Sequence, residues 1–191
     1  MVICTPELYR NLGIFFREGR EKSEAFNAGY YRYHHPELKA NPDQIDWDTD
    51  QECLDLLPTM QTDITLKKDG KTLIIDAKYY GTILQENFDV QTIRSANLYQ
   101  IYTYVKNLDK NHTNNVAGML LYAKTQASIQ PDNEYVIGGN RIIVKTLDLD
   151  VPFAGIAEQL ERIAETMDDN CVSSMNHPLC SGQHNIYTIR K

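Results

Sequence analysis

Two aspartates and a lysine in the middle of the chain have types and a spacing that could do chemistry. Asp63 lies in residues 60–67, where apolar and polar side chains alternate as in a strand, and Asp76 and Lys78 lie toward the end of a second strand-like stretch, residues 71–80. The Asp-Gly pair between these stretches is a strong hairpin signal. A tight hairpin can place Asp63 beside Asp76, and residues two apart on a strand share a face. We therefore expect two carboxylates and an ammonium in a small volume, at the exposed end of a strand whose other half is apolar.

This group of side chains suits metal-assisted hydrolysis of a phosphodiester. Two close carboxylates repel unless a cation joins them, and hard ions such as Mg²⁺ prefer oxygen ligands and retain waters. A neighbouring lysine can orient or deprotonate a metal-bound water, or steady phosphate charge. On spacing alone, a strand-end salt bridge between one aspartate and Lys78 explains the same pattern about equally well.

A second pair of polar side chains follows on a predicted helix, at residues 89–108. Gln100 and Tyr104 are four residues apart, so they share one helical face. Behind a strand that carries carboxylates and a lysine, they could bind a DNA backbone or orient the catalytic groups. The alternative is an aromatic stripe that fills the core.

The remaining pattern predicts the elements that hold these residues in place. Residues 116–123 and 141–147 read as buried strands, and residues 152–167 as an amphipathic helix. Residues 6–34 have helical spacing interrupted by glycines, and His35-Pro36 ends that segment. A hairpin followed by a helix and further buried strands predicts an α/β fold, with a mixed β-sheet flanked by helices.

Three strings of the sequence carry a resemblance to a known family. Residues 56–66 (LLPTMQTDITL) and 73–80 (LIIDAKYY) resemble the core of PD-(D/E)xK nucleases of the restriction-endonuclease-like fold, and residues 97–104 (NLYQIYTY) resemble the Q-x-x-x-Y motif of the RecB-like branch. More narrowly, residues 25–167 resemble the McrC-type nuclease subunits of McrBC restriction systems, which cut DNA that contains modified cytosine.

The resemblance implies a Mg²⁺-dependent endodeoxyribonuclease acting on 5-methylcytosine DNA in the cytoplasm. Its catalytic triad falls on Asp63, Asp76 and Lys78, and its Gln/Tyr pair on Gln100 and Tyr104. Asp63, Asp76 and the Ala77 carbonyl would then hold Mg²⁺, while Lys78 positions the attacking water and Gln100 and Tyr104 support the site. Glu24 is a candidate for the glutamate that often joins such sites from the first helix, with Glu52 as a substitute.

The resemblance also implies a partner, a McrB-like AAA+ GTPase, and sets the expected domain limits. McrC-type subunits dock on that partner through an N-terminal region, which residues 1–24 do not match; residues 25–167 form the expected nuclease domain and residues 168–191 an irregular tail. A truncated, non-catalytic remnant that binds DNA or a partner, and a RecB-like repair exonuclease, are alternatives. The tail contains Cys171, His177, Cys180 and His184, whose spacing matches no familiar zinc site.

The charge composition limits how the protein could bind nucleic acid. The 191 residues carry 19 basic and 26 acidic side chains, a net charge of −7, which argues against a protein that coats nucleic acid by bulk electrostatics. Residues 63–110, however, carry seven basic and six acidic side chains, a net charge of +1. We therefore expect weak unassisted DNA binding and a partner that brings the domain to DNA. Four scattered cysteines and the lack of a visible signal or membrane span favour a reduced cytoplasm.

Overall fold

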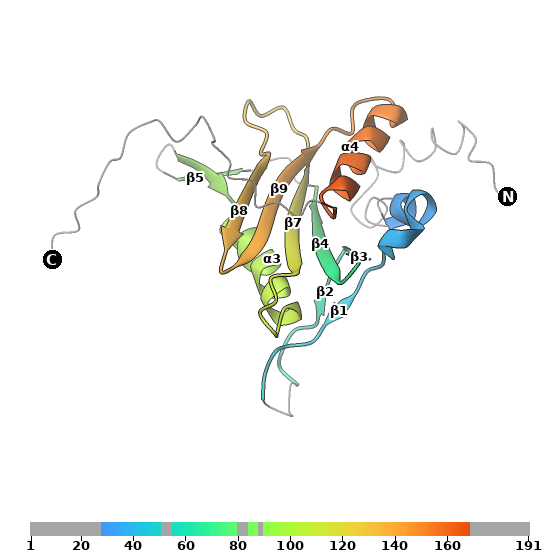
Figure 1. Ribbon diagram of the computed structural model, residues 1–191. Helices are drawn as coiled ribbons and strands as arrows, with labels where there is room; N and C mark the ends of the chain where they lie inside the picture. Colours follow the sequence, from blue (N-terminus) through green and yellow to red (C-terminus); the bar gives the residue numbers. More distant parts are fainter. Residues whose placement is uncertain (1–27, 51–54, 80–83, 88–89, 169–191) are drawn as a thin grey trace.

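The computed structural model describes residues 28–50, 55–79, 84–87 and 90–168. Its centre is a five-stranded mixed sheet in the order β3-β4-β7-β9-β8 (Figure 1). These strands are β3 (Ile64–Lys68), β4 (Lys71–Lys78), β7 (Val116–Ala123), β8 (Asn133–Ile137) and β9 (Asn140–Leu147). The α/β fold with a mixed sheet, expected from the sequence, is confirmed.

The three central strands run parallel, and this brings their carboxyl ends to one edge of the sheet. Lys78 of β4 lies opposite Tyr122 of β7, which lies opposite Thr146 of β9. The outer strands β3 and β8 run antiparallel to their neighbours and join them through short turns. Side chains from different parts of the chain therefore meet at the edge where β4, β7 and β9 end.

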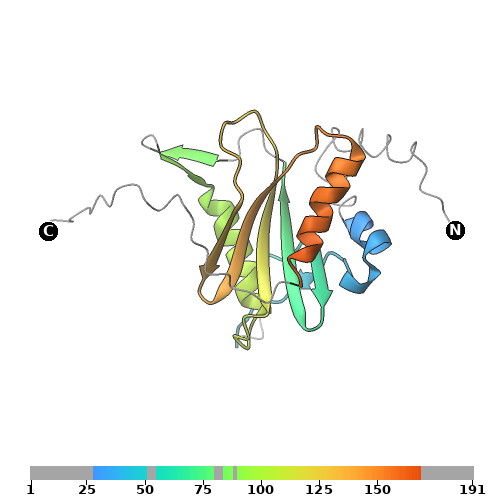
Figure 2. The ribbon, with the colours of Figure 1, turned by 45° about the horizontal axis from the view of Figure 1, so that its top comes forward.

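One helix covers each face of this sheet (Figure 2). Helix α3 (Ser95–Leu108) packs on the face that carries Ile74 and Leu120, and α4 (Phe153–Glu165) packs on the opposite face, which carries Ile75 and Met119. Residues alternate between the two faces along each strand, as the pleat requires. Asp76 and Lys78 have the parity of Ile74, so they face α3.

Residues 28–34 are helical and pack beside α4, followed by the 3₁₀ turn η1 (Pro36–Leu38). The Tyr31 hydroxyl donates to the Leu160 carbonyl over 3.1 Å, and His35 Nε2 lies 2.7 Å from a carboxylate oxygen of Glu161. These contacts fix the segment that precedes the sheet. None of the described helices is both long and apolar enough to span a membrane.

Several elements differ from the sequence-based expectation. The predicted strand over residues 60–67 is divided into β2 (Met60–Gln61), which pairs with β1 (Gln44–Ile45), and β3. The predicted helix over residues 89–108 begins only at Ser95, after the hairpin of β5 (Leu84–Asn87) and β6 (Val90–Ile93). Strand β8 was not predicted, because this edge strand lacks a clear alternation of buried and exposed residues.

Candidate active site

Asp63 occupies the step between β2 and β3, one residue before β3 begins, and not the interior of one continuous strand as the sequence predicted. Thr62 causes this step, because its amide donates to the Asp43 carbonyl and its hydroxyl accepts from the Asp43 amide, at 2.9 and 2.8 Å. The backbone thereby leaves the β1–β2 pair and joins the ladder with β4 at Ile64. Asp63 stands at the position opposite Asp76, as the hairpin register predicts.

The Asp63 carboxylate is fixed by the backbone of β4. Its Oδ2 accepts a hydrogen bond from the Ala77 amide over 2.8 Å, so it lies beside the residue that separates Asp76 from Lys78. The side chain is only partly buried. The hairpin thus places Asp63 beside the segment of β4 that carries Asp76 and Lys78.

Asp76 and Lys78 form a buried ion pair. Lys78 Nζ lies 2.6 Å from Asp76 Oδ2, and the two side chains are 3% and 2% exposed, respectively. The prediction that this end of the strand is exposed is wrong, because α3 lies over this face of β4 and both side chains are buried. Burying two charges costs free energy unless they are paired with good geometry. The Asp76–Lys78 contact supplies this pairing and holds the two groups close together.

Gln100 and Tyr104 extend this pair into a chain of hydrogen bonds. Lys78 Nζ donates to Gln100 Oε1 over 3.0 Å, and Gln100 Nε2 donates to the Tyr104 hydroxyl over 3.0 Å. The four-residue spacing on α3 lets one side chain meet the next. The amide of Gln100 thus fixes the Lys78 ammonium from the helix side, while Asp76 fixes it from the strand.

Sequence reasoning missed a second hydrogen bond behind the same network. Asn97 Nδ2 donates to the Tyr122 hydroxyl over 2.9 Å, and both side chains are buried. Tyr122 is the β7 residue opposite Lys78, and Asn97 lies three residues before Gln100 on the same helix. The signal was present in the sequence, since a polar residue at i−3 from Gln100 shares its helix face.

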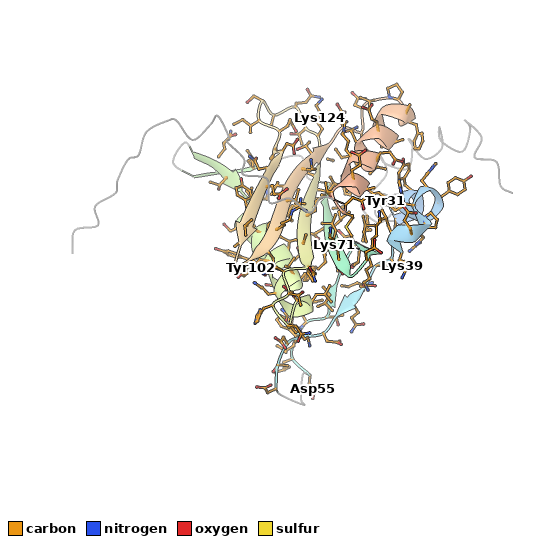
Figure 3. All side chains as sticks on the ribbon, in the orientation of Figure 1. Tyr31, Lys39, Asp55, Lys71, Tyr102 and Lys124 are labelled. Atoms are coloured by element: carbon orange, nitrogen blue, oxygen red, sulfur yellow. The ribbon has the colours of Figure 1, made fainter. Side chains whose placement is uncertain are left out.

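The exposed ion pair of Lys124 and Asp148 lies at the same edge of the sheet, just beyond the ends of β7 and β9. Lys124 follows β7 directly, and its Nζ lies 2.6 Å from Asp148 Oδ2 just after β9 (Figure 3). The hydrogen bond from Lys124, helped by the amide of Asp150, lowers the pKa of the Asp148 carboxyl below its ordinary value.

The lysines of the β3–β4 turn do not belong to the site. Lys71 begins β4 and Asp76 lies five residues further on, so their backbones are about 17 Å apart along the strand. Lys67 and Lys68 form ion pairs with Asp43 and Asp168. Other expected residues (Glu24, Glu52 and the cysteines and histidines of 171–184) lie outside the described part of the chain.

Comparisons with known proteins relate the chain to restriction systems. A model of the family described as "McrBC 5-methylcytosine restriction system component" matches residues 37–123, which include Asp63, Asp76, Lys78, Gln100 and Tyr104. The chain is also 32% identical over 152 residues to the type IV methyl-directed restriction enzyme EcoKMcrBC of Escherichia coli (strain K12). Both comparisons therefore show that the chain is similar to McrBC restriction-system components.

The similarity to the McrBC relative covers most of this chain but only part of the relative. The aligned residues make up 76% of the chain and 43% of the Escherichia coli protein, so the chain spans less than half the length of that McrBC component. The McrC-type assignment made from the sequence is confirmed.

Proposed function

We propose that residues 25–167 form the catalytic domain of a metal-dependent endodeoxyribonuclease of the PD-(D/E)xK type, acting in a 5-methylcytosine-dependent restriction system. One observation carries the proposal. Asp63 and Asp76 stand opposite each other across a hairpin, and Lys78 lies between Asp76 and Gln100. Two carboxylates and a fixed ammonium from adjacent strands suit metal-assisted hydrolysis of a phosphodiester.

The proposed donor set consists of oxygen atoms, which hard ions such as Mg²⁺ prefer. Among the residues that the structure describes, no cluster of three or more His, Cys, Asp or Glu side chains is arranged to hold a metal ion. Mg²⁺ is commonly bound through one or two carboxylates while it keeps several waters. Asp63 and Asp76 would supply the carboxylates and Ala77 its carbonyl. When bound, the ion would supply a Lewis acid for the phosphate and an acidified water.

The protein groups around that position have separate roles in the proposed reaction. Lys78 presents an ammonium, held by Asp76 and Gln100, toward the attacking water or the charge that develops on the phosphate. Gln100 sets the direction of that ammonium and is itself oriented by the Tyr104 hydroxyl. The Ala77 amide holds one oxygen of Asp63, which restricts the direction of the other.

The proposed substrate is DNA, and the proposed partner is a McrB-like AAA+ GTPase. The similarity to a methyl-directed restriction enzyme supports both, as does the net charge of +1 on residues 63–110 of an acidic chain. Weak intrinsic DNA binding would make cleavage depend on a partner that recruits the domain.

A calorimetric titration with Mg²⁺ and Mn²⁺ tests the metal site. The native chain should bind the ion, and Asp63→Asn should lose most of that binding because it removes one ligand charge. The amide oxygen of asparagine can still accept from the Ala77 amide, so folding should be preserved. An equal heat of binding in the variant would refute the assignment. Asp43→Asn, at a carboxylate paired with Lys67, is the control.

A non-catalytic binding module is the second candidate function. The ion pair of Asp76 and Lys78 favours it, because a buried carboxylate that already faces a lysine is neutralised without a metal. The same titration separates the two functions, since such a module would bind no ion in either form.

A further inference from the structure

Helix α3 has an outer face whose character differs from the rest of this acidic protein. The helix contains one lysine and no aspartate or glutamate over its 14 residues. On the other side of the sheet, α4 carries Glu158, Glu161 and Glu165 over a similar length. An anionic partner that approaches the molecule therefore meets no carboxylate from α3 itself.

The exposed ring of Tyr99 is the main feature of this face. The tyrosine is 67% exposed, whereas Tyr104, on the inner face of the same helix, is 9% exposed. Ala96, Tyr99 and Thr103 are three and four residues apart, so they line one stripe, which we call the outer face of α3. The Thr103 hydroxyl donates to the Tyr99 carbonyl over 2.7 Å and stays on this stripe.

A positive charge lies about two turns along the helix from Tyr99. Lys106 Nζ donates to the carbonyl of Gly138 and to Asn140 Oδ1, and it lies 5.9 Å from the centre of the Tyr102 ring (Figure 3 labels Tyr102). Both hydrogen-bond acceptors are neutral, so neither cancels the charge of the ammonium.

The outer face of α3 also adjoins the candidate active site. Ala96 and Thr103 lie four residues before and three residues after Gln100, so both are its neighbours on the helix surface. Gln100 in turn contacts Lys78. A nucleic acid strand bound at the candidate site would leave it across this stripe, and every base has a π-face that can stack on an aromatic side chain.

We propose that the outer face of α3 binds the DNA strand that enters the candidate active site, with a base or sugar of that strand stacked on the ring of Tyr99. The proposal rests on the proposed nuclease function, which it deepens by assigning the strand's path. Tyr99 is here a binding residue and takes no part in the chemical step.

Binding of a fluorescent oligonucleotide, followed by anisotropy at low salt with EDTA present, tests the proposal without cleavage. Tyr99→Ala should weaken binding between about fivefold and a hundredfold, the range found when a stacked aromatic ring is removed. Tyr99→Phe should bind within about twofold of the native chain because it keeps the ring. Ala96→Glu should also weaken binding, since it adds a negative charge to the stripe; a glutamate in the first turn of a helix is favourable for folding.

Tyr33→Ala is the matched control. Tyr33 is 60% exposed and belongs to the helical segment that packs beside α4, on the opposite side of the sheet from α3. Its removal should leave binding unchanged. Equal binding by Tyr99→Ala and the native chain, equal losses in Tyr99→Ala and Tyr33→Ala, or no binding by the native chain would each overturn the proposal. A selective loss of binding in Tyr99→Ala, together with no cleavage by the native chain when Mg²⁺, the AAA+ GTPase partner and GTP are all present, would support the binding face and refute the nuclease.

Discussion

Replacement of Lys78 by methionine tests how the candidate site is held together. The substitution keeps most of the aliphatic stem and removes the ammonium that lies 2.6 Å from Asp76 Oδ2. Asp76 is then left as a carboxylate that is 2% exposed, without its cation. Gln100 Oε1 loses its donor as well. Because Asp76 and Lys78 are both buried, we expect this substitution to cost folding stability.

The magnitude follows from the burial of the pair. Removal of one partner from a buried ion pair typically costs about 3–5 kcal/mol, because the remaining charge is desolvated and unpaired. Lys124→Met is a matched control, since the Lys124–Asp148 contact has the same 2.6 Å length but side-chain exposures of 47% and 25%. An exposed pair of this kind contributes about 0.2–1 kcal/mol. The two variants thus each break an ion pair with a 2.6 Å N–O distance, and the two pairs differ in how deeply they are buried.

Urea denaturation followed by the fluorescence of Trp47 measures both free energies. Trp47 is the single tryptophan of the chain, packs against the cluster beneath α3, and donates from Nε1 to the Pro58 carbonyl over 2.8 Å. Lys78→Met should lower the unfolding midpoint by about 2 M, given typical urea dependences for a domain of this size. Lys124→Met should shift it by less than about 0.5 M.

The double variant Asp76→Asn/Lys78→Met completes the test. It removes the buried negative charge that Lys78→Met leaves without its lysine, so it should be more stable than Lys78→Met alone, and the two substitutions should show strong coupling. The reasoning is refuted if Lys78→Met and Lys124→Met lose equal stability, or if the substitutions at Asp76 and Lys78 prove additive.

Three further predictions concern the elements around the site. Gly118→Ala should lower the free energy of unfolding by about 1–3 kcal/mol in urea denaturation, because a Cβ there would meet side-chain atoms of Ile101 and Val105 at 2.6 and 2.8 Å. Gly29→Ala is the control: it lies in a helical segment with nothing within 4 Å of the added atom, so this variant should be neutral or stabilising. Burial raises the pKa of the Asp109 carboxyl, but hydrogen bonds from Asn140, Thr113 and Asn114 outweigh this effect and lower the pKa overall. The ionised carboxylate therefore stabilises the fold above the ordinary pKa of Asp, and this stabilisation is lost as the pH falls through the lower pKa of the folded state. Asp109→Asn should therefore cost about 1–3 kcal/mol at neutral pH and progressively less in acid, as measured by urea denaturation across pH; a constant difference at all pH values would contradict this. Tyr104→Phe removes the acceptor of the Gln100 amide and should lower the free energy of unfolding by about 0.5–1.5 kcal/mol. If Gln100 orients Lys78, cleavage should fall by a larger factor than stability. Unchanged cleavage would show that this hydrogen bond is structural alone.

The sequence predicted those features of the site that depend on local spacing. The Asp-Gly turn is formed, with positive φ angles at Asp69 and Gly70 as the tightest hairpins require. Asp76 and Lys78 share a face because they are two apart on β4. Residues 116–123, expected as a buried strand, are β7 with the same limits. Each of these features follows from periodicity or from turn chemistry within a few residues.

The features that the sequence did not predict depend on contacts between distant segments. Asp76 and Lys78 are buried because α3 lies over them, and a strand pattern carries no information about the helix that covers it. The Asn97–Tyr122 hydrogen bond joins a helix to a strand 25 residues away. The step at Thr62 requires Asp43 as its partner, 19 residues earlier. Such details follow from tertiary packing, which overrides local preference.

The central claim is that Asp63 and Asp76 form the metal site of a nuclease, and cleavage of 5-methylcytosine DNA by the Asp63→Asn variant tests it most directly. The assay contains Mg²⁺, the proposed AAA+ GTPase partner and GTP, with the native chain and Asp43→Asn as references. The account predicts cleavage by both references and none by Asp63→Asn, which we expect to keep the fold because the Asp63 side chain is only partly buried. Cleavage by Asp63→Asn at the rate of the native chain would contradict it.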